Sequence, residues 1–292
     1  MRGLSGYHIM IVSKYFDDFR DFINLELVCK KFRGNMEKFH FNPISLNSKT
    51  LGYFPNIETL HLWDEEDENF GNGFMMNTKE KVECEKKGVL KREFFQIIVW
   101  FNVDFETVDR NKSRDIEFKN VTYTKNDRKK FGNDIPSSVT SIGNDCFSYC
   151  SNLTSVLIPS SVTSIASWCF NGCSNLSSIT IPSSVKSIGY YCFNGCISLS
   201  SVTIPTSVTS ISDFCFGECN SLSSVTIPPS ITSINKSCFS GCSSLSSITI
   251  PSSVTSIGDR CFSECYSLTS VTIPPSVISI GYCCFNGCKK FK

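Results

Sequence analysis

The sequence predicts an α/β repeat fold, in which a solenoid with one parallel sheet follows a mixed, mainly helical N-terminal cap region. Three observations support this prediction. The chain copies itself every 23 residues from Ile135 onward, and every copy contains the apolar pattern L-x-x-[VI]-x-I. Composition also changes at this point, since residues 1–134 hold 22 of the 28 Lys and Arg and 22 of the 27 Asp and Glu. A period of this length is typical of stacked supersecondary units.

Seven repeat units make up the predicted solenoid, which spans 135–292, and the last is incomplete. They begin at Ile135, Ile158, Ile181, Ile204, Ile227, Ile250 and Ile273. A unit of this size buries too few apolar side chains to offset the conformational entropy of ordering it. Each unit therefore needs its neighbours in order to fold.

The pattern L-x-x-[VI]-x-I predicts one short strand per unit, with the apolar positions pointing inward. One example, at the end of the second unit, is Leu176, Ile179 and the following Ile181, and Pro182 suits the end of a strand. We expect parallel strands in one sheet near 153–158, 176–181, 199–204, 222–227, 245–250 and 268–273. Phe193, in the C-F-x-x-C segment, is expected in the core, and the two Cys of that segment would share one face of a helical turn.

The polar positions of these strands form the candidate binding face. They are Ser178, Thr180, Ser201, Thr203, Ser224, Thr226, Ser247, Thr249, Ser270 and Thr272. The row lacks the aromatic and Arg side chains that dominate tight interfaces, so we expect weak or multivalent protein binding.

Two columns of cysteine run through the units. They are Cys146, Cys169, Cys192, Cys215, Cys238, Cys261 and Cys284, then Cys150, Cys173, Cys196, Cys219, Cys242, Cys265 and Cys288. The favoured interpretation is small buried side chains stacked along the core. Zinc ligation stays open as an alternative, because adjacent units spell C-x3-C-x18-C-x3-C, but no four ligands stand out. Disulfides between stacked units also stay open. We predict no stoichiometric metal.

The first 134 residues divide into two predicted regions. Residues 1–50 are expected to form a helical cap, and 51–134 an irregular region that leads into the repeats. Strand patterns end at Leu62 and Tyr123, the acidic 63–90 predicts a mobile loop, and 91–108 has the pattern of an amphipathic helix.

The pattern L-x-x-[VI]-T-I-P-x-S-V-x-S-I-G-x-x-C-F-x-x-C resembles the BspA-like leucine-rich repeats across all seven units. The resemblance implies a right-handed leucine-rich-repeat solenoid that acts in protein recognition or adhesion, including at the cell surface. In that family the first cysteine column is usually Ala, whereas here every unit has Cys. The segment 9–32 resembles the later part of an F-box, although Leu4-Ser5-Gly6-Tyr7 replaces the usual opening. The alternative function is therefore a ubiquitin-ligase substrate receptor that docks a Skp-type adaptor.

Composition and motifs argue against an enzyme. The three His, at 8, 40 and 61, lie outside the repeats, and no phosphate-binding loop or HExxH motif is present. His61 falls in a strand pattern, where a satisfied structural histidine is the expected role. We predict no catalytic residues and no cofactor. A formal net charge of +1 gives no global field for nucleic acid.

Location and self-association are two further expectations. No apolar run is long enough for a signal peptide or a transmembrane helix, so the expected location is the cytoplasm. The last strand, 268–273, forms an open edge of the sheet. Such an edge can pair with a second chain, although Lys289, Lys290 and Lys292 oppose this by repulsion. Weak end-to-end self-association is therefore a hypothesis, and a monomer protected by these lysines is the alternative.

Overall fold

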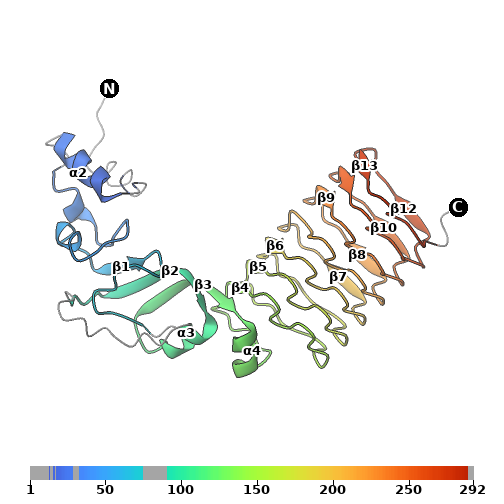
Figure 1. Cartoon of the computed structure of the whole chain (residues 1–292), viewed down its shortest axis with the longest axis horizontal. Helices are drawn as coiled ribbons and strands as arrows, with labels where there is room; N and C mark the ends of the chain where they lie inside the picture. The colour runs from blue at the N-terminus through green and yellow to red at the C-terminus, as the bar shows by residue number, and fades with distance from the viewer. Residues whose placement is uncertain (1–12, 14–15, 17, 29–32, 75–90, 289–292) are drawn as a thin grey trace. The chain divides into compact units, whose positions relative to one another are not determined.

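The structure is a computed structural model that describes residue 13, residue 16 and residues 18–28, 33–74 and 91–288 (Figure 1). It forms two compact units, Met1–Val121 and Thr122–Lys292. Much of the F-box-like segment 9–32, and Lys289, Lys290 and Lys292, lie outside the described residues. So does 75–90 of the predicted loop.

The first unit combines short helices with parallel strands. Its elements are α2 (Phe19–Val28), η2 (Met36–Lys38), η3 (Leu51–Tyr53), β1 (Thr59–Leu62), β2 (Gln96–Asp104), α3 (Phe105–Arg110) and β3 (Ile116–Tyr123), whose last two residues belong to the second unit. Strands β1 and β2 pair in parallel, with Leu60 opposite Ile97. Helix α2 contributes Phe22 to a core in which this ring meets Phe39 and Phe54 edge-on. The strands predicted to end at Leu62 and Tyr123 are confirmed as β1 and β3.

The amphipathic helix predicted over 91–108 is wrong, because half of that segment is strand β2. Its buried side chains alternate at Ile97 and Val99, which is the two-residue period of a strand. The five residues 97–101 are three β-branched residues followed by two aromatic ones, and both types favour strands. The helix begins only at Phe105, where the Asp104 side chain accepts a hydrogen bond from the Thr107 amide.

The second unit is the predicted parallel solenoid, and each 23-residue unit forms one rung of it (Figure 1). It begins with α4 (Lys125–Phe131), which Thr124 and Asp127 cap reciprocally. The rungs carry β4 (Ser141–Ile142), β5 (Ser164–Ile165), β6 (Ser187–Ile188), β7 (Ser201–Thr203), β8 (Ser224–Thr226), β9 (Ser233–Ile234), β10 (Ser247–Thr249), β11 (Ser256–Ile257), β12 (Ser270–Thr272) and β13 (Ser279–Ile280). The strand pairings between the described rungs are parallel.

The parallel strands form two ladders where the sequence predicted one. The unpredicted one, the Ser-Ile ladder, comprises β4, β5, β6, β9, β11 and β13, and bridges at Ile211 join β6 to β9. The predicted strands near 199–204, 222–227, 245–250 and 268–273 form β7, β8, β10 and β12, but they pair as β7–β8 and β10–β12 and not as one sheet. Near 153–158 and 176–181 only a bridge between Leu157 and Thr180 forms.

The third side of each rung is a series of tight turns. The expected helical turn at C-F-x-x-C does not form, because the residue before each first-column Cys has a positive φ, from 50° to 61°. A residue in this left-handed conformation cannot continue a right-handed helix. Backbone hydrogen bonds instead join neighbouring rungs, as from the Phe170 amide to the Cys192 carbonyl at 2.8 Å.

Aromatic rings fill the centre of the rungs. Phe193 is fully buried, as predicted. One Phe per rung stacks on the next from Phe147 to Phe285, with ring centroids 5.1–5.7 Å apart and ring planes within 13°. Both cysteine columns are buried beside this stack, with at most 8% of any of these residues exposed.

Candidate functional site

The ten predicted binding residues are all exposed and follow the strands β7, β8, β10 and β12 with the segment 178–180. We call this row the Ser/Thr face; it comprises Ser178, Thr180, Ser201, Thr203, Ser224, Thr226, Ser247, Thr249, Ser270 and Thr272. Between the hydroxyls, Val202 and Ile248 point inward and are buried. The alternation of the strand therefore presents only small hydroxyl side chains on this surface.

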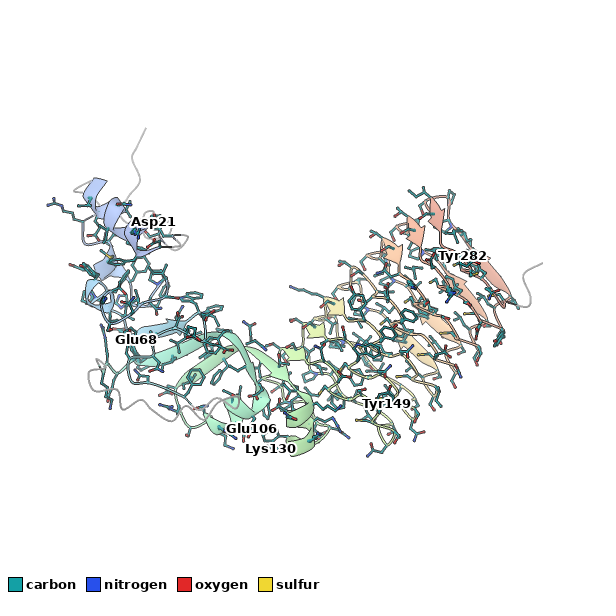
Figure 2. All side chains as sticks on the ribbon, viewed as in Figure 1. Asp21, Glu68, Glu106, Lys130, Tyr149 and Tyr282 are labelled. Atoms are coloured by element: carbon teal, nitrogen blue, oxygen red, sulfur yellow. The ribbon has the colours of Figure 1, made fainter. Side chains whose placement is uncertain are left out.

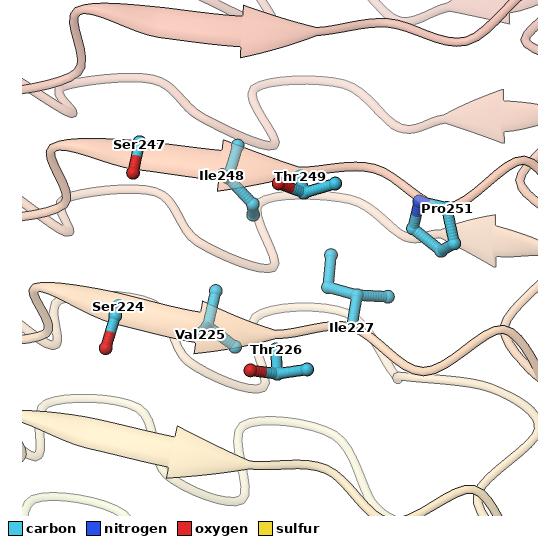
Figure 3. A pocket seen from close by; sticks show the side chains of 8 residues that line it. All are labelled: Ser224, Val225, Thr226, Ile227, Ser247, Ile248, Thr249 and Pro251. Carbon is cyan, nitrogen blue, oxygen red and sulfur yellow. The ribbon is translucent and has the colours of Figure 1, made fainter.

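A break in the hydrogen-bonded pairing divides the Ser/Thr face at its centre. Strand β8 pairs with β7, and β10 pairs with β12, but β8 and β10 do not pair with each other. A hollow of about 290 Å³ lies at this break (Figure 3). Its lining residues are Ser224, Val225, Thr226, Ile227, Ser247, Ile248, Thr249 and Pro251.

The side chains that line this hollow suit the binding of a partner and not the catalysis of a reaction. Its lining contains hydroxyl and apolar side chains but no carboxylate, imidazole, amine or thiol that could transfer a proton. Its volume also falls just below the roughly 300–1,000 Å³ of typical small-molecule sites. The half-buried Val225 adds an apolar surface between the hydroxyls of Thr226 and Thr249.

The second cysteine column forms a ladder of thiol hydrogen bonds. Each thiol from Cys173 to Cys288 lies 3.0–3.2 Å from a Phe carbonyl oxygen of the preceding rung and donates to it, as Cys196 does to Phe170. Burial raises the pKa of these thiols, to about 12 for Cys173 and Cys265. Because nucleophiles and metal ligands are thiolates, protonated thiols in the core suit packing. The expectation that both columns are buried is confirmed.

Other candidate chemical sites are sparse in the part of the chain that the structure describes. Within it, no group of three or more His, Cys, Asp or Glu could hold a metal ion. The 15 cysteines described there are all free thiols. No helix in the same residues is long and apolar enough to cross a membrane.

His61, which the sequence suggested was a satisfied strand residue, lies in an aromatic cluster of the first unit. Its ring stacks on Phe41 at 4.9 Å and meets the rings of Trp63 and Trp100. Its buried Nδ1 has no hydrogen-bond partner among the described residues, so that expectation is wrong for this atom. Burial, followed by the positive charge of Lys119, lowers the pKa of His61 to about 4.

The turn side of the array carries a feature that the sequence analysis missed. We call the tenth to sixteenth residues of each unit, such as 190–196, the turn face. The rings of Trp168, Tyr191 and Phe214 stack there with centroids 4.1 and 4.5 Å apart and planes 5° apart. These residues share repeat position 11, which is otherwise Asp, Ser, Arg or Cys. Variation at one position of a uniform repeat was the signal that could have revealed them.

Backbone strain accompanies this stack. All three aromatic residues have a positive φ, from 54° to 61°. The left-handed conformation costs a residue with a Cβ about 1–2 kcal/mol. A stacked aromatic pair stabilises the fold by about 0.5–1.5 kcal/mol, which only offsets that backbone cost. Stability alone therefore gives little reason for aromatic residues at this position. Figure 2 shows two further exposed rings of the turn face, Tyr149 on the first rung and Tyr282 on the last.

Comparison with known proteins agrees with this architecture. A family model described as a BspA type leucine rich repeat region, in 6 copies, matches residues 122–242 and 169–292, which is more than half of the chain. The search of curated proteins found no match.

Solved structures of leucine-rich repeat proteins are also similar. The T. pallidum leucine rich repeat protein is 29% identical over 60% of this chain and 79% of its own, with a TM-score of 0.50. A leucine-rich repeat protein from Bacteroides ovatus is 41% identical over 51% of this chain, with a TM-score of 0.49. The present chain spans only 38% of the length of the B. ovatus protein.

Proposed function

Because the chain belongs to the BspA-type leucine-rich repeat proteins, we propose that its repeat array is a non-enzymatic scaffold that binds a partner protein through the Ser/Thr face. This is a scaffold family, and no catalytic family is indicated. Adhesion is the form of binding that the family resemblance suggests. We expect the scaffold to need no cofactor.

The observation that carries the proposal is the alignment of ten exposed hydroxyl residues along neighbouring parallel strands. Hydroxyls both donate and accept hydrogen bonds, so a partner backbone or polar side chain can be matched on successive rungs. The row repeats with little change, and it offers no Trp, Tyr or Arg anchor. A partner with a repeated contact of its own would gain affinity through multivalency.

A photo-crosslinking comparison tests the proposed face. A benzoylphenylalanine residue is placed at Thr203 on the Ser/Thr face, or at Thr209 beside the Ser-Ile ladder. Both positions are exposed threonines, so the two variants match in residue type and exposure. After incubation with the protein extract of the source cells, or with their intact surface, we expect a protein adduct from position 203 only.

Equal adducts from positions 203 and 209, or adducts from position 209 alone, would contradict the proposed face. A comparison of the full chain with residues 122–292 then shows whether the partner needs the first unit. Docking of a Skp-type adaptor to the first unit stays a prediction, and co-purification with that adaptor tests it. A cytoplasmic location also stays a prediction, and no comparison supports it; the family resemblance points to the cell surface instead.

We also propose weak self-association through the last described rung. Ile273 and Ile280 are 40% and 48% exposed there, whereas their equivalents in the previous rung, Ile250 and Ile257, are 4% and 2% exposed. Strands β12 and β13 have no described strand on their outer sides. Light scattering across a concentration series should show association that Val271→Pro removes, because proline lacks a backbone N–H. A strictly monomeric wild type at about 100 μM would end this proposal.

A further inference from the structure

The two aromatic stacks of the array begin differently. The buried phenylalanine stack is closed at its first ring by Tyr123 and by an arginine of the same chain. The guanidinium carbon of Arg128 lies 5.9 Å from the centroid of the Phe147 ring, and its Nε donates a hydrogen bond to the Cys146 carbonyl at 2.6 Å. A cation over an aromatic face is stabilised by the negative potential of that face.

The surface stack has no such closure. Its first ring is Trp168, which is 40% exposed and stacks on Tyr191 on one side. No described aromatic ring lies against its other side, which faces the first rung. Position 11 of that rung is Asp145, an exposed residue whose carboxylate makes no hydrogen bond or ion pair to the described residues. The first-rung side of the Trp168 indole therefore carries no described ring, and the exposed Asp145 stands at the equivalent position of that rung; we call this place the slot.

Charge on the turn face favours a cationic occupant. All five acidic residues of the array and two basic ones, Lys236 and Arg260, lie on this face, which gives the face itself a net charge of −3. Arg128 of the adjoining helix α4 is already engaged by the Cys146 carbonyl and the Phe147 ring. Most exposed Trp and Tyr residues of the array lie here too, including Tyr190 at 55% exposure; Tyr266 lies one residue beyond the turn face. Trp, Tyr and Arg are the side chains that dominate the binding energy of protein interfaces. The Ser/Thr face, by contrast, contains none of them.

We propose that the turn face around Trp168 binds an arginine presented by a partner protein. The guanidinium lies against the free side of the Trp168 indole and pairs with the Asp145 carboxylate, as Arg128 lies against Phe147 inside the array. Guanidinium is planar, weakly hydrated and able to form two parallel hydrogen bonds, so it fits this slot better than the ammonium of lysine. The proposal rests on the scaffold role of the array but uses a different face from the proposed docking surface.

The indole N–H signals of the full chain, labelled with ¹⁵N-tryptophan, test the proposal directly. The chain has three Trp, and Trp168→Phe identifies the signal of Trp168. The probe is the blocked peptide acetyl-Gly-Arg-Gly-amide at low salt, about 50 mM, where screening is weak. We expect a saturable shift of the Trp168 signal alone. The lysine peptide and the uncharged citrulline peptide should bind at least about fivefold more weakly.

A matched pair of variants separates pairing from general charge. Asp145→Asn should weaken binding of the arginine peptide at least about fivefold, because the ion pair is lost. Asn tolerates the positive φ of 55° at this position, so the backbone is kept. Asp259→Asn changes the same charge on the same face five rungs away, and it should weaken binding less than about twofold.

Three results would overturn the proposal. The first is no shift of the Trp168 signal up to about 20 mM peptide, a concentration above the dissociation constants of weak specific complexes. The second is equal binding of the arginine and lysine peptides, or equal effects of Asp145→Asn and Asp259→Asn. The third is wild-type self-association that the peptide abolishes, which would make the arginine that of a second copy. None of these results bears on crosslinking at Thr203, so the proposed docking face is tested separately.

Discussion

The two units of this chain pack their aromatic cores in opposite ways. In the first unit, Phe22, Phe39 and Phe54 meet edge-on, with ring planes 68–75° apart. In the array, one Phe per rung lies parallel to the next. An edge-on cluster specifies one closed core, whereas a parallel stack continues for as many rungs as the sequence supplies. The array therefore keeps its interior constant and can vary only on its outside.

The largest expected difference between the units is their response to alkali. Burial raises the pKa of the array thiols above the unfolded value, so the folded state keeps protons that the unfolded state loses. The contribution of these thiols to stability is complete below about pH 8.5 and declines as the pH rises, by about 1.4 kcal/mol per pH unit for each thiol. The stability lost from several thiols together can exceed the roughly 5–15 kcal/mol free energy of unfolding of a domain.

We therefore expect the array to melt at a far lower temperature at pH 10.5 than at pH 7, under reducing conditions. Fluorescence separates the units, because Trp63 and Trp100 report the first unit and Trp168 reports the array. The described residues of the first unit contain no cysteine, which makes it the internal control. A Trp168 transition that does not move with pH would contradict the buried-thiol account.

Removing one ring from each core compares the two packing modes directly. Phe193→Ala should destabilise the array by about 3–5 kcal/mol, because it leaves a cavity and interrupts the stack on both sides. The matched variant Phe54→Ala should cost a similar amount in the first unit. Hydrogen exchange should show faster exchange in the rungs next to residue 193 and no change in the first unit. Loss of protection confined to residues 192–194 would argue against coupling between rungs.

Acid should affect the first unit and spare the array. The pKa of His61 is about 4 in the folded state, lowered by burial and Lys119, against about 6.5 when unfolded. The unfolded state therefore binds more protons between these values, and the stability that His61 contributes is lost as the pH falls from 6.5 to 4. The melting temperature of the first unit should fall over that range in the wild type and less in His61→Phe. Identical acid profiles for the two proteins would contradict this role.

The smallest effect is expected on the Ser/Thr face. Thr203 is exposed, and the structure gives its side chain no hydrogen bond, so Thr203→Ala should change stability by less than about 0.5 kcal/mol. Urea unfolding of the array measures this difference. A loss of 1 kcal/mol or more would mean that the face contributes to folding, contrary to the division between a constant interior and a free exterior.

The sequence predicts the interior of the array well because the same apolar positions recur in every unit, which identifies them as buried even where one unit alone would not. Burial of Phe193 and of both cysteine columns follows from that pattern. The Ser-Ile ladder was missed because two residues per rung, such as Ser187 and Ile188, are too few to show the period of a strand. The turns at C-F-x-x-C were missed because none of the left-handed residues before the first-column Cys is Gly.

The first unit and the turn face show where sequence reasoning ends. Strand β2 carries Ile98 and Trp100 on its outer side as well as Ile97 and Val99 inside, so an apolar run fits a helix or a strand equally well. The stack from Trp168 to Phe214 joins residues 23 positions apart, and only the pitch of the solenoid brings their rings to 4.1–4.5 Å. Position in three dimensions, and not residue type, creates that surface.

The most direct test of the account replaces threonine pairs by lysine on the two ladder surfaces. One variant carries Thr203→Lys and Thr249→Lys on the Ser/Thr face. Its control carries Thr209→Lys and Thr255→Lys at repeat position 6, where the third unit already has Lys186. The measurement is the affinity of each full-length variant for the partner crosslinked at position 203, with the melting temperature recorded beside it. The account predicts melting temperatures close to wild type for both variants and at least about tenfold weaker binding for the first alone. Wild-type affinity in the first variant, or equal losses in both, would contradict it.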